Sequence, residues 1–220
     1  MAPRAVVFDL DYTLAVPVRD RATLLADAAE AAGAPPLSRR AYRRAHRETA
    51  HGETRVPIFE ALLADVETAV DPSEVARSYR EAVAEAMEPV DGTEALLADL
   101  RGHHQVGLLT DGPARAGRSK LRALGWSDHF DAAVVTGEVG ADKPDPRGFE
   151  VVCERLAVPP DEAVYVGDDP ELDVAGAVDA GLAVVQVLFE DGPAPDDRAD
   201  ATVERASLAA DLPAVVADLR

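Results

Sequence analysis

The sequence predicts an α/β protein with an open parallel sheet, helices on both sides of that sheet, and a separate helical unit inserted after the first strand. Short apolar runs rich in β-branched residues alternate with helical patterns along most of the chain, which is typical of repeated strand-helix-strand units. One interval, 16–88, breaks this alternation because it contains helical patterns only. These two observations carry the prediction of the fold class.

The first apolar run, 5–10, ends in a pair of carboxylates. Asp9 and Asp11 stand two positions apart, so on a strand that continued past Leu10 both side chains would point to the same face. At about 4.5 Å and an effective dielectric constant of about 20, their repulsion is on the order of 3 to 4 kcal/mol. The pair therefore predicts a compensating positive group at this strand end.

The interval 16–88 is expected to form an inserted helical domain. Stretches rich in turn residues separate its helical patterns, and Ser38 and Asp71 are the expected N-caps. The helical patterns cover 21–32, 38–50, 57–67 and 72–87. Residues 1–15 and 89–220 are expected to form the α/β core.

Beyond residue 89, strands and helices are expected to alternate. Further apolar runs occur at 105–111, 132–137, 163–168 and 183–188. Helical patterns occur at 93–101, 115–124, 146–156 and 172–180. Because ligands of open parallel sheets bind beyond the carboxyl ends of the strands, the chemistry is expected where these runs end. The residues at those ends are Asp9, Thr110, Gly137 and Asp168.

Composition and charge narrow the class of protein. The 220 residues are 47% apolar, enough for one sizeable core and a smaller unit. The net charge of −19 argues against nucleic acid and anionic membranes as partners. No apolar run approaches the ~20 residues of a membrane span, and the N-terminus shows no signal-peptide pattern, so a cytoplasmic protein is expected. The sequence does not indicate an oligomeric state.

The basic residues are almost all arginine. Of 22 basic residues only Lys120 and Lys143 are lysine. This acidic, lysine-poor composition is typical of proteins from a salt-loaded cytoplasm, where ions screen self-repulsion. Lysine at 143 is expected where a compact ammonium is required and a guanidinium would not fit. Lys120, by contrast, is interpreted as an ordinary helix-surface residue. The only cysteine, Cys153, has a helical core spacing and is expected to be buried.

Four strand ends together form a candidate site. They are DLDYT (9–13), LLTDG (108–112), DKPDP (142–146) and VGDDPELD (166–173). Each is weak alone, because an acidic strand end is often only a solvated turn or an N-cap. Together, Asp9, Asp11 and Asp168 would converge above one sheet edge, and ligands that are all oxygen suit Mg²⁺. A magnesium ion is then the positive group that the paired aspartates require.

In order and spacing these motifs resemble the four motifs of the haloacid dehalogenase-like hydrolase superfamily. The resemblance lies in FDLDYTL, LLTDG, the lysine of KPDP and VGDDPELD, and it spans essentially the whole chain. It is closest in kind to the phosphatase-type branch, whose helical cap is inserted after the first motif. The resemblance implies a Rossmann-like core, a helical cap at 16–88, and Mg²⁺-dependent hydrolysis of a small phosphomonoester.

The resemblance also implies roles for the two aspartates of the first motif. Asp9 matches the nucleophile that attacks phosphorus and becomes an aspartyl phosphate. Asp11 matches the acid and base, which protonates the leaving alkoxide and later deprotonates the hydrolytic water. Its backbone carbonyl matches a metal ligand. Two carboxylates in different surroundings can hold different protonation states, so this division of roles is physically reasonable.

The remaining motifs match groups that bind phosphate and metal. Thr110, with backbone donors at Asp111 and Gly112, matches the phosphate-binding motif, since a hydroxyl and amides at a helix start suit an anion. Lys143 matches the lysine that holds the transferring phosphate and orients the nucleophile.

The fourth motif leaves one choice open. Asp168 matches a Mg²⁺ ligand. Asp169 or Asp173 would complete the acidic cluster, although Asp173 could equally cap the following helix. Asp173 is slightly preferred, as a ligand or as a support behind the ligands.

Three other functions compete with a phosphatase. A carboxylate nucleophile could displace a halide from carbon, but that reaction requires neither Mg²⁺ nor an acid at Asp11, and dehalogenases of the family lack this second aspartate. A catalytically silent binding protein on the same fold is the second alternative. The third is a nucleotide hydrolase, because residues 112–119 nearly spell a P-loop, with Arg118 in place of the required lysine.

The substrate is expected to be selected by the inserted helices. Arg40, Arg43, Arg44 and Arg47 follow an i, i+3, i+4, i+7 spacing. One hypothesis is that one or two of them hold an acidic part of the substrate, as in a phosphoglycolate-like or nucleotide-like ester. The alternative is a basic helix that pairs with acidic surface.

Overall fold

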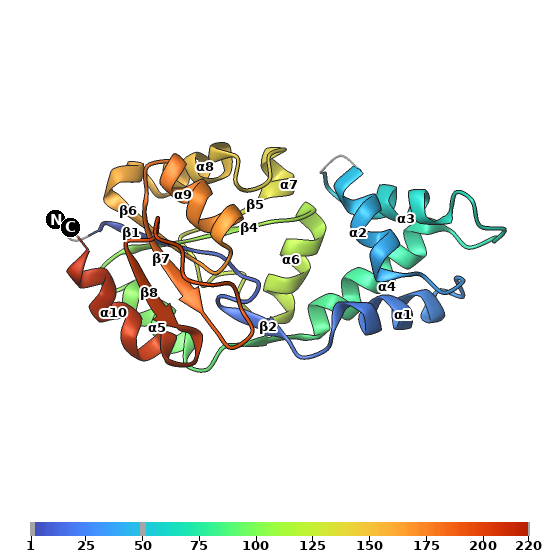
Figure 1. The fold of residues 1–220 in the computed structure, drawn as a ribbon, viewed down its shortest axis with the longest axis horizontal. Coiled ribbons are helices and arrows are strands. Elements are labelled where there is room, and N and C mark those ends of the chain that lie inside the picture. The colour runs from blue at the N-terminus through green and yellow to red at the C-terminus, as the bar shows by residue number, and fades with distance from the viewer. Residues whose placement is uncertain (1–2, 49–51, 220) are drawn as a thin grey trace.

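The core of the protein is a six-stranded parallel sheet with helices on both faces (Figure 1). The computed structural model describes residues 3–48 and 52–219. The strand order is β5-β4-β1-β6-β7-β8. The bounds are β1 Ala5–Phe8, β4 Gln105–Thr110, β5 Ala132–Val135, β6 Ala163–Gly167, β7 Ala183–Leu188 and β8 Ala201–Glu204. The predicted fold class is confirmed.

β1 lies in the middle of the sheet because its residues are all apolar and can be covered on both faces. All four of its residues are fully buried. In the parallel register, Val6 pairs with Val106 on one side and with Val164 on the other. The strand therefore carries its carboxyl end, and the residues that follow, to the centre of one sheet edge.

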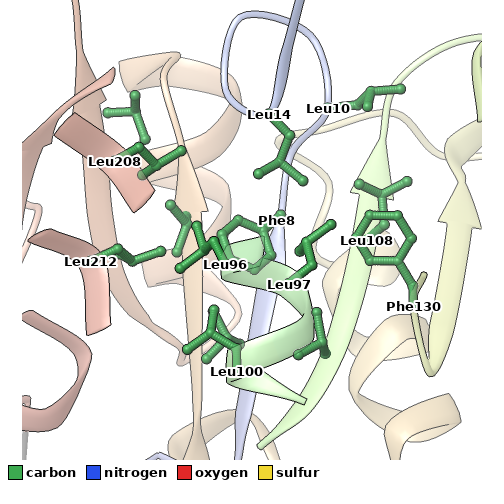
Figure 2. Close-up of a cluster of buried hydrophobic side chains, with 14 of the residues drawn as sticks. Phe8, Leu10, Leu14, Leu96, Leu97, Leu100, Leu108, Phe130, Leu208 and Leu212 are labelled. Atoms are coloured by element: carbon green, nitrogen blue, oxygen red, sulfur yellow. The ribbon is translucent and has the colours of Figure 1, made fainter. Parts of the chain in front are cut away.

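Helices cover the sheet in two layers. The core helices are α5 Thr93–Leu100, α6 Ala114–Ala123, α7 Thr136–Val139, α8 Pro146–Leu156, α9 Ala175–Asp179 and α10 Leu208–Asp218. On one face, α5 and α10 pack leucines around Phe8 (Figure 2). On the other face, Phe149 of α8 packs edge-on against Tyr165 of β6. Cys153 lies in this second layer, so its predicted burial is confirmed.

Several element boundaries differ from the sequence prediction. β1 ends at Phe8 because the chain turns after Asp9, and Tyr12 adopts a φ of 66°. The predicted helix 172–180 is divided into a π-helical turn, Pro170–Val174, and α9. β8 and α10 are not predicted from the sequence at all.

Four helices form the inserted unit, here called the cap, and they pack around a shared aromatic core. They are α1 Arg21–Ala31, α2 Arg39–Glu48, α3 Val56–Leu63 and α4 Pro72–Glu85. Tyr42, Phe59 and Tyr79 contact one another at centroid distances of 5.1 to 5.9 Å. Asp71 caps α4 by accepting from the Ser73 amide, as predicted. The last residues of the predicted helix 38–50 lie outside the described part of the chain.

A two-stranded antiparallel ribbon joins the cap to the core. It consists of β2 (Ala15–Pro17) and β3 (Met87–Pro89), so the predicted limits 16 and 88 fall within it. The cap also contacts the first turn of α6, where the amides of Ala114 and Arg115 donate to the carbonyls of Gly52 and Glu53 (3.2 and 3.0 Å). α6 thus lies between the sheet and the cap (Figure 1). Among the described residues, no helix is long and apolar enough to span a membrane.

Candidate active site

The polar residues of the four motifs meet at the carboxyl edge of the sheet, beneath the cap. A cleft of about 1160 Å³ lies there. The core contributes Asp11, Asp111, Gly112 and Lys143 to its lining, and helices α1, α2 and α4 of the cap contribute the facing wall. The topology brings these residues together because β1, β4 and β6 are neighbours and all end at this edge.

Asp9 directly follows β1 and is buried, with 5% of its surface exposed. Its amide donates to the Val166 carbonyl (2.9 Å), which continues the sheet by one residue. Its Oδ1 accepts from Lys143 Nζ (2.7 Å). Burial raises the pKa of Asp9 well above its ordinary value, although Lys143 opposes the shift. An ionised Asp9 therefore needs more positive charge than Lys143 supplies.

Lys143 is a buried cation that connects two carboxylates. Its Nζ donates to Asp173 Oδ1 (2.6 Å) as well as to Asp9, and it contacts the hydroxyl of Tyr165 at 3.2 Å. Burial lowers the pKa of this ammonium, but Asp173 and Asp9 outweigh that effect and hold it well above its ordinary value. The lysine is thus charged, and it fixes the position of Asp9.

Three carboxylates form a cluster that fits a metal ion. Asp9, Asp168 and Asp173 each offer one oxygen, and the three oxygens lie within 4.8 Å of one another. Thr13 Oγ1 donates to Asp168 Oδ1 (3.3 Å). Burial and the neighbouring Asp173 raise the pKa of Asp168 to about 7. In the described part of the chain, Lys143 is the only residue that forms an ion pair with this cluster. An oxygen-only, over-negative site of this kind fits Mg²⁺.

The structure separates the roles of Asp169 and Asp173. Asp169 caps the π-helical turn, because its Oδ1 accepts from the amides of Glu171 and Leu172 (2.9 Å each). Asp173 instead lies in the cluster, and its Oδ2 accepts from the amides of Asp168 and Asp169 (3.1 and 3.0 Å). Both Asp173 oxygens thus already have donors, which fits a support behind the ligands.

Asp11 does not join the cluster through its side chain. Its Oδ1 accepts from Arg21 Nη2 (2.9 Å) and its Oδ2 pairs with Lys120 Nζ. Burial raises the pKa of Asp11, but Lys120 and Arg21 outweigh it, and the pKa lies below its ordinary value. Because the chain leaves strand geometry after Phe8, Asp9 and Asp11 each have their own lysine, and this separation relieves much of the repulsion expected from the sequence.

The prediction that Lys120 is an ordinary helix-surface residue is wrong. Lys120 is only 4% exposed, because α6 packs against α4 of the cap and not against solvent. It lies on the same helix face as Ala116, Gly117 and Leu121, which are also buried. The scarcity of lysine and this shared face were the signals in the sequence that pointed to its role.

Two residues of the phosphate-binding motif form hydrogen bonds with neighbouring loops of the site. Asp111 Oδ1 accepts from the Lys143 amide (3.0 Å). The Gly112 amide, expected to face phosphate, donates to Thr136 Oγ1 (3.0 Å) at a φ of 119°. Thr110 Oγ1 differs, because it is buried and has no hydrogen-bond partner among the described residues. The Thr110 hydroxyl is therefore a group of this motif that has bonding capacity left for an anion.

Several residues of the site had no role in the sequence analysis. Thr13 lies within the first motif, two residues after Asp11, so the sequence placed it near the site. Tyr165 and Thr136 occur in apolar runs, and nothing in the sequence marked them. Tyr165 donates to the Leu109 carbonyl (3.2 Å), which ties β6 to β4 at the site.

The cleft wall includes only some of the predicted cap arginines. Arg43 and Arg47 line the cleft, whereas Arg40 and Arg44 do not. Two further arginines, Arg39 and Arg55, also line it.

Arg118 of the P-loop-like stretch does not line the cleft. Arg118 Nε donates to Glu138 Oε1 (2.7 Å), and its Nη2 donates to the Ala133 carbonyl (3.0 Å). Both contacts tie α6 to β5 and α7, so Arg118 has a structural partner where a P-loop lysine would bind phosphate.

Comparison with known proteins agrees with the geometry. A family model described as haloacid dehalogenase-like hydrolase matches residues 3–181. Pyrimidine 5'-nucleotidase YjjG of Escherichia coli is 34% identical over 115 residues, which are 52% of this chain and 51% of that protein. The match to YjjG thus spans about half of its length. Glyceraldehyde 3-phosphate phosphatase of Methanopyrus kandleri is 30% identical over 194 residues, covering 84% of this chain and 83% of that protein.

A solved structure has the same fold over nearly the whole chain. The crystal structure of 2-haloacid dehalogenase from Pseudomonas syringae superposes with a TM-score of 0.72 and 26% identity, covering 98% of both chains. The family model covers most of the sequence, residues 3–181. The chain therefore belongs to the haloacid dehalogenase-like hydrolase family.

Proposed function

We propose that this protein is a Mg²⁺-dependent phosphatase that hydrolyses a small phosphomonoester through an aspartyl phosphate on Asp9. One observation carries the proposal: three buried carboxylates converge beside a single lysine, an arrangement that requires a further cation. The similarity to a phosphatase over 84% of the chain supports the reaction class. The net charge of −19 favours a small phosphorylated substrate over nucleic acid.

In the first step, Asp9 acts as the nucleophile. An oxygen of its carboxylate attacks phosphorus, and the bond between phosphorus and the ester oxygen breaks. Lys143 holds Asp9 Oδ1 in place, and the unpartnered hydroxyl of Thr110 donates to a phosphoryl oxygen. Asp11 gives its proton to the leaving alkoxide. A dianionic phosphate beside Asp11 raises the pKa of this carboxyl by repulsion, which favours the protonated form.

In the second step, water regenerates the enzyme. Asp11, now a carboxylate, takes a proton from the water as its oxygen attacks phosphorus. The bond between phosphorus and the Asp9 oxygen breaks, and inorganic phosphate leaves. Lys120 and Arg21 favour the ionised form of Asp11 in this step.

The oxygens that would hold Mg²⁺ come from Asp9, Asp168 and the backbone carbonyl of Asp11, with Asp173 as the support behind them. When bound, the ion supplies positive charge that neutralises the phosphoryl oxygens and the carboxylate cluster. Asp173 keeps Asp168 in position because its Oδ2 accepts hydrogen bonds from the backbone amides of Asp168 and Asp169.

Carbon–halogen cleavage is the competing reaction. It is considered because the chain is 26% identical to a 2-haloacid dehalogenase of the same fold. The acidic cluster and the cleft-lining carboxylate of Asp11 favour phosphate transfer, because halide displacement by a carboxylate needs neither a cation nor an acid.

The test is turnover of p-nitrophenyl phosphate with Mg²⁺, with EDTA, and in Asp9→Asn, beside chloride release from 2-chloropropionate. We expect phosphate release that requires both Mg²⁺ and Asp9, and no chloride release. Chloride release without metal would establish a dehalogenase. Absence of both reactions in the folded protein would leave the silent binding protein, and either outcome would overturn the proposal.

A further inference from the structure

The cap wall of the cleft carries an excess of positive charge. Among the described residues that line the cleft, seven are arginine or lysine and four are aspartate. The chain as a whole has a net charge of −19, so the charge of the cleft lining is opposite in sign to that of the whole molecule. Such a reversal concentrates anions at the site.

Two of these cations have no anionic partner among the residues that the structure describes. Arg39 Nη1, Arg55 Nε and Arg55 Nη1 are buried and make no hydrogen bond among the described residues. A buried polar atom without a partner destabilises the fold, and more so when it is charged. Neither arginine forms an ion pair within the described chain, although other cap arginines do, such as Arg77 with Glu74. The two guanidinium groups therefore have unused donors that suit an oxyanion.

The tyrosines of the cap hold these guanidinium groups in place. The Arg39 guanidinium lies 5.0 Å from the centre of the Tyr42 ring, and that of Arg55 lies 5.7 Å from the Tyr79 ring. The two rings pack edge to face at 5.1 Å. Stacking on buried rings orients the planar groups before any ligand binds.

Arg55 also lies close to the reacting end of the cleft. A methyl group added at Gly112 would lie 4.0 Å from Arg55 Nη2. Arg55 is one of the cations that lower the pKa of Asp11. Arg55 thus lies on the side on which the leaving group departs, because Asp11 is the proposed proton donor to that group.

The two tyrosines of the cap wall do not favour a nucleobase beside Arg39 and Arg55, and the exposed Tyr12 of the same cleft belongs to the core. Tyr42 and Tyr79 are 4% and 2% exposed, so neither offers a ring face for stacking. The cap wall presents guanidinium donors instead, and these match carboxylate or phosphate oxygens.

From these observations we infer that Arg39 and Arg55 form a second anion site, and that the substrate is a phosphomonoester whose leaving group carries its own oxyanion. The inference rests on the proposed phosphatase function. The second oxyanion is a carboxylate or a further phosphate. The sequence hypothesis placed this role on one or two of Arg40, Arg43, Arg44 and Arg47. Of these, Arg43 and Arg47 lie in the same wall but have no buried unpartnered atoms among those described.

Matched esters test the inference. Phosphoglycolate is compared with ethyl phosphate, and 1,3-propanediol bisphosphate with propyl phosphate, in Mg²⁺. We expect kcat/KM to favour at least one charged ester tenfold or more over its neutral match. In Arg39→Gln and Arg55→Gln this ratio is expected to fall at least tenfold. Arg40→Gln, a change on the same helix as Arg39 but outside the cleft, should leave the ratio unchanged.

Three outcomes would overturn the inference. They are equal kcat/KM for matched esters, an unchanged ratio in both variants, and an equal loss on both esters, which would place the arginines on the transferring phosphate. If the glutamine variants fail to fold, the wild-type ratio and the lysine variants at both positions still decide, because lysine keeps charge but loses the planar donors.

A binding measurement separates this inference from the proposed function. Phosphonoacetate and ethylphosphonate cannot be turned over, and calorimetry gives their affinities for wild type and both variants. If no ester is hydrolysed but phosphonoacetate binds at least tenfold tighter through Arg39 and Arg55, the anion site stands and the phosphatase proposal fails. If esters are hydrolysed and the two phosphonates bind equally, the reverse holds.

Discussion

The two lysines of this chain form similar ion pairs in different surroundings. Lys143 and Asp9 are enclosed by the core, where both side chains are at most 7% exposed. Lys120 and Asp11 meet at the boundary between core and cap, and the Asp11 side chain is 22% exposed to the cleft. Burial raises the pKa of Asp9, whereas Lys120 and Arg21 outweigh burial and lower that of Asp11. The comparison teaches that similar lysine–aspartate pairs can leave two aspartates with pKa shifts of opposite direction, because burial and the neighbouring carboxylates outweigh the lysine at Asp9 but not at Asp11.

The largest expected effect comes from breaking the core pair. Lys143→Ala leaves Asp9 and Asp173 buried without their shared cation, so we expect a loss of about 3 to 5 kcal/mol in the free energy of unfolding and no measurable turnover. Urea unfolding in EDTA, with a phosphatase assay, measures both. Lys143→Arg should not restore activity, because a guanidinium does not fit the place of the compact ammonium. Wild-type stability in the alanine variant would show that the ion pairs of Lys143 do not contribute to the free energy of unfolding.

A smaller effect is expected from the cleft aspartate. Asp11→Asn keeps the shape of the side chain but removes the acid and base, so kcat should fall by about 10²- to 10⁴-fold. Stability should change much less than in Lys143→Ala, because Asp11 is partly exposed and holds no strand end. Steady-state kinetics and urea unfolding on the same preparation compare the two aspartates. A kcat within threefold of wild type would remove Asp11 from the mechanism.

The metal should change the pH dependence of stability. Burial, and Asp173 next, raise the pKa of Asp168 to about 7 when no cation is bound. A carboxyl with a raised folded-state pKa contributes its full stability below its unfolded-state pKa of about 4, and loses that stability progressively until the pH has risen through about 7. Without Mg²⁺ this group therefore contributes less stability at pH 8 than at pH 6.

Thermal melts with Mg²⁺ or EDTA at both pH values check this expectation. Mg²⁺ should raise Tm more at pH 8 than at pH 6, and Asp168→Asn should abolish most of the increase. Asp169→Asn, which alters the nearby helix cap and not the cluster, is the matched control. An equal Mg²⁺ effect in wild type and Asp168→Asn would place the ion elsewhere.

The smallest effect is expected from the second lysine. Lys120→Met removes the cation that most lowers the pKa of Asp11, so that pKa should rise and the corresponding limb of the profile of kcat/KM against pH should move to higher pH. Arg21 still pairs with Asp11, so folding should persist. Arg122→Met on the exposed part of the same helix should leave the profile unchanged. A shift to lower pH would contradict the proposed pairing.

The contrast between Lys143 in the core and Lys120 at the cap boundary also explains which parts of the fold and site could be predicted from the sequence. The sheet, the cap position and the meeting of Asp9, Lys143 and Asp168 follow from local patterns, because parallel strands end at one edge. The place of Lys120 depends on which face of α6 the cap covers, and that is set by packing between segments far apart in the chain. Arg55 was not singled out for the same reason, since its neighbours Tyr79 and Gly112 are distant in sequence.

The chain end shows a second limit. β8 has only four residues, of which Val203 alone is buried, and it lies at the edge of the sheet, so its apolar pattern is too short to predict a strand. Asp169 and Asp173 were both possible caps by residue type. Their hydrogen bonds distinguish them in the structure, and Gly167 leaves the room that Asp173 occupies, since an added methyl carbon there would lie 2.6 Å from the Asp173 carboxyl carbon.

The most direct test of the central claim is the covalent intermediate. Wild type and Asp11→Asn are mixed with p-nitrophenyl phosphate in Mg²⁺, quenched in acid within milliseconds to seconds, and mapped by peptide mass spectrometry. We predict a phosphoryl group on Asp9, which persists longer in Asp11→Asn because water attack is slowed, and which is absent with EDTA. Turnover with no phosphorylated peptide in either protein, or with the phosphoryl group on another residue, would contradict the account.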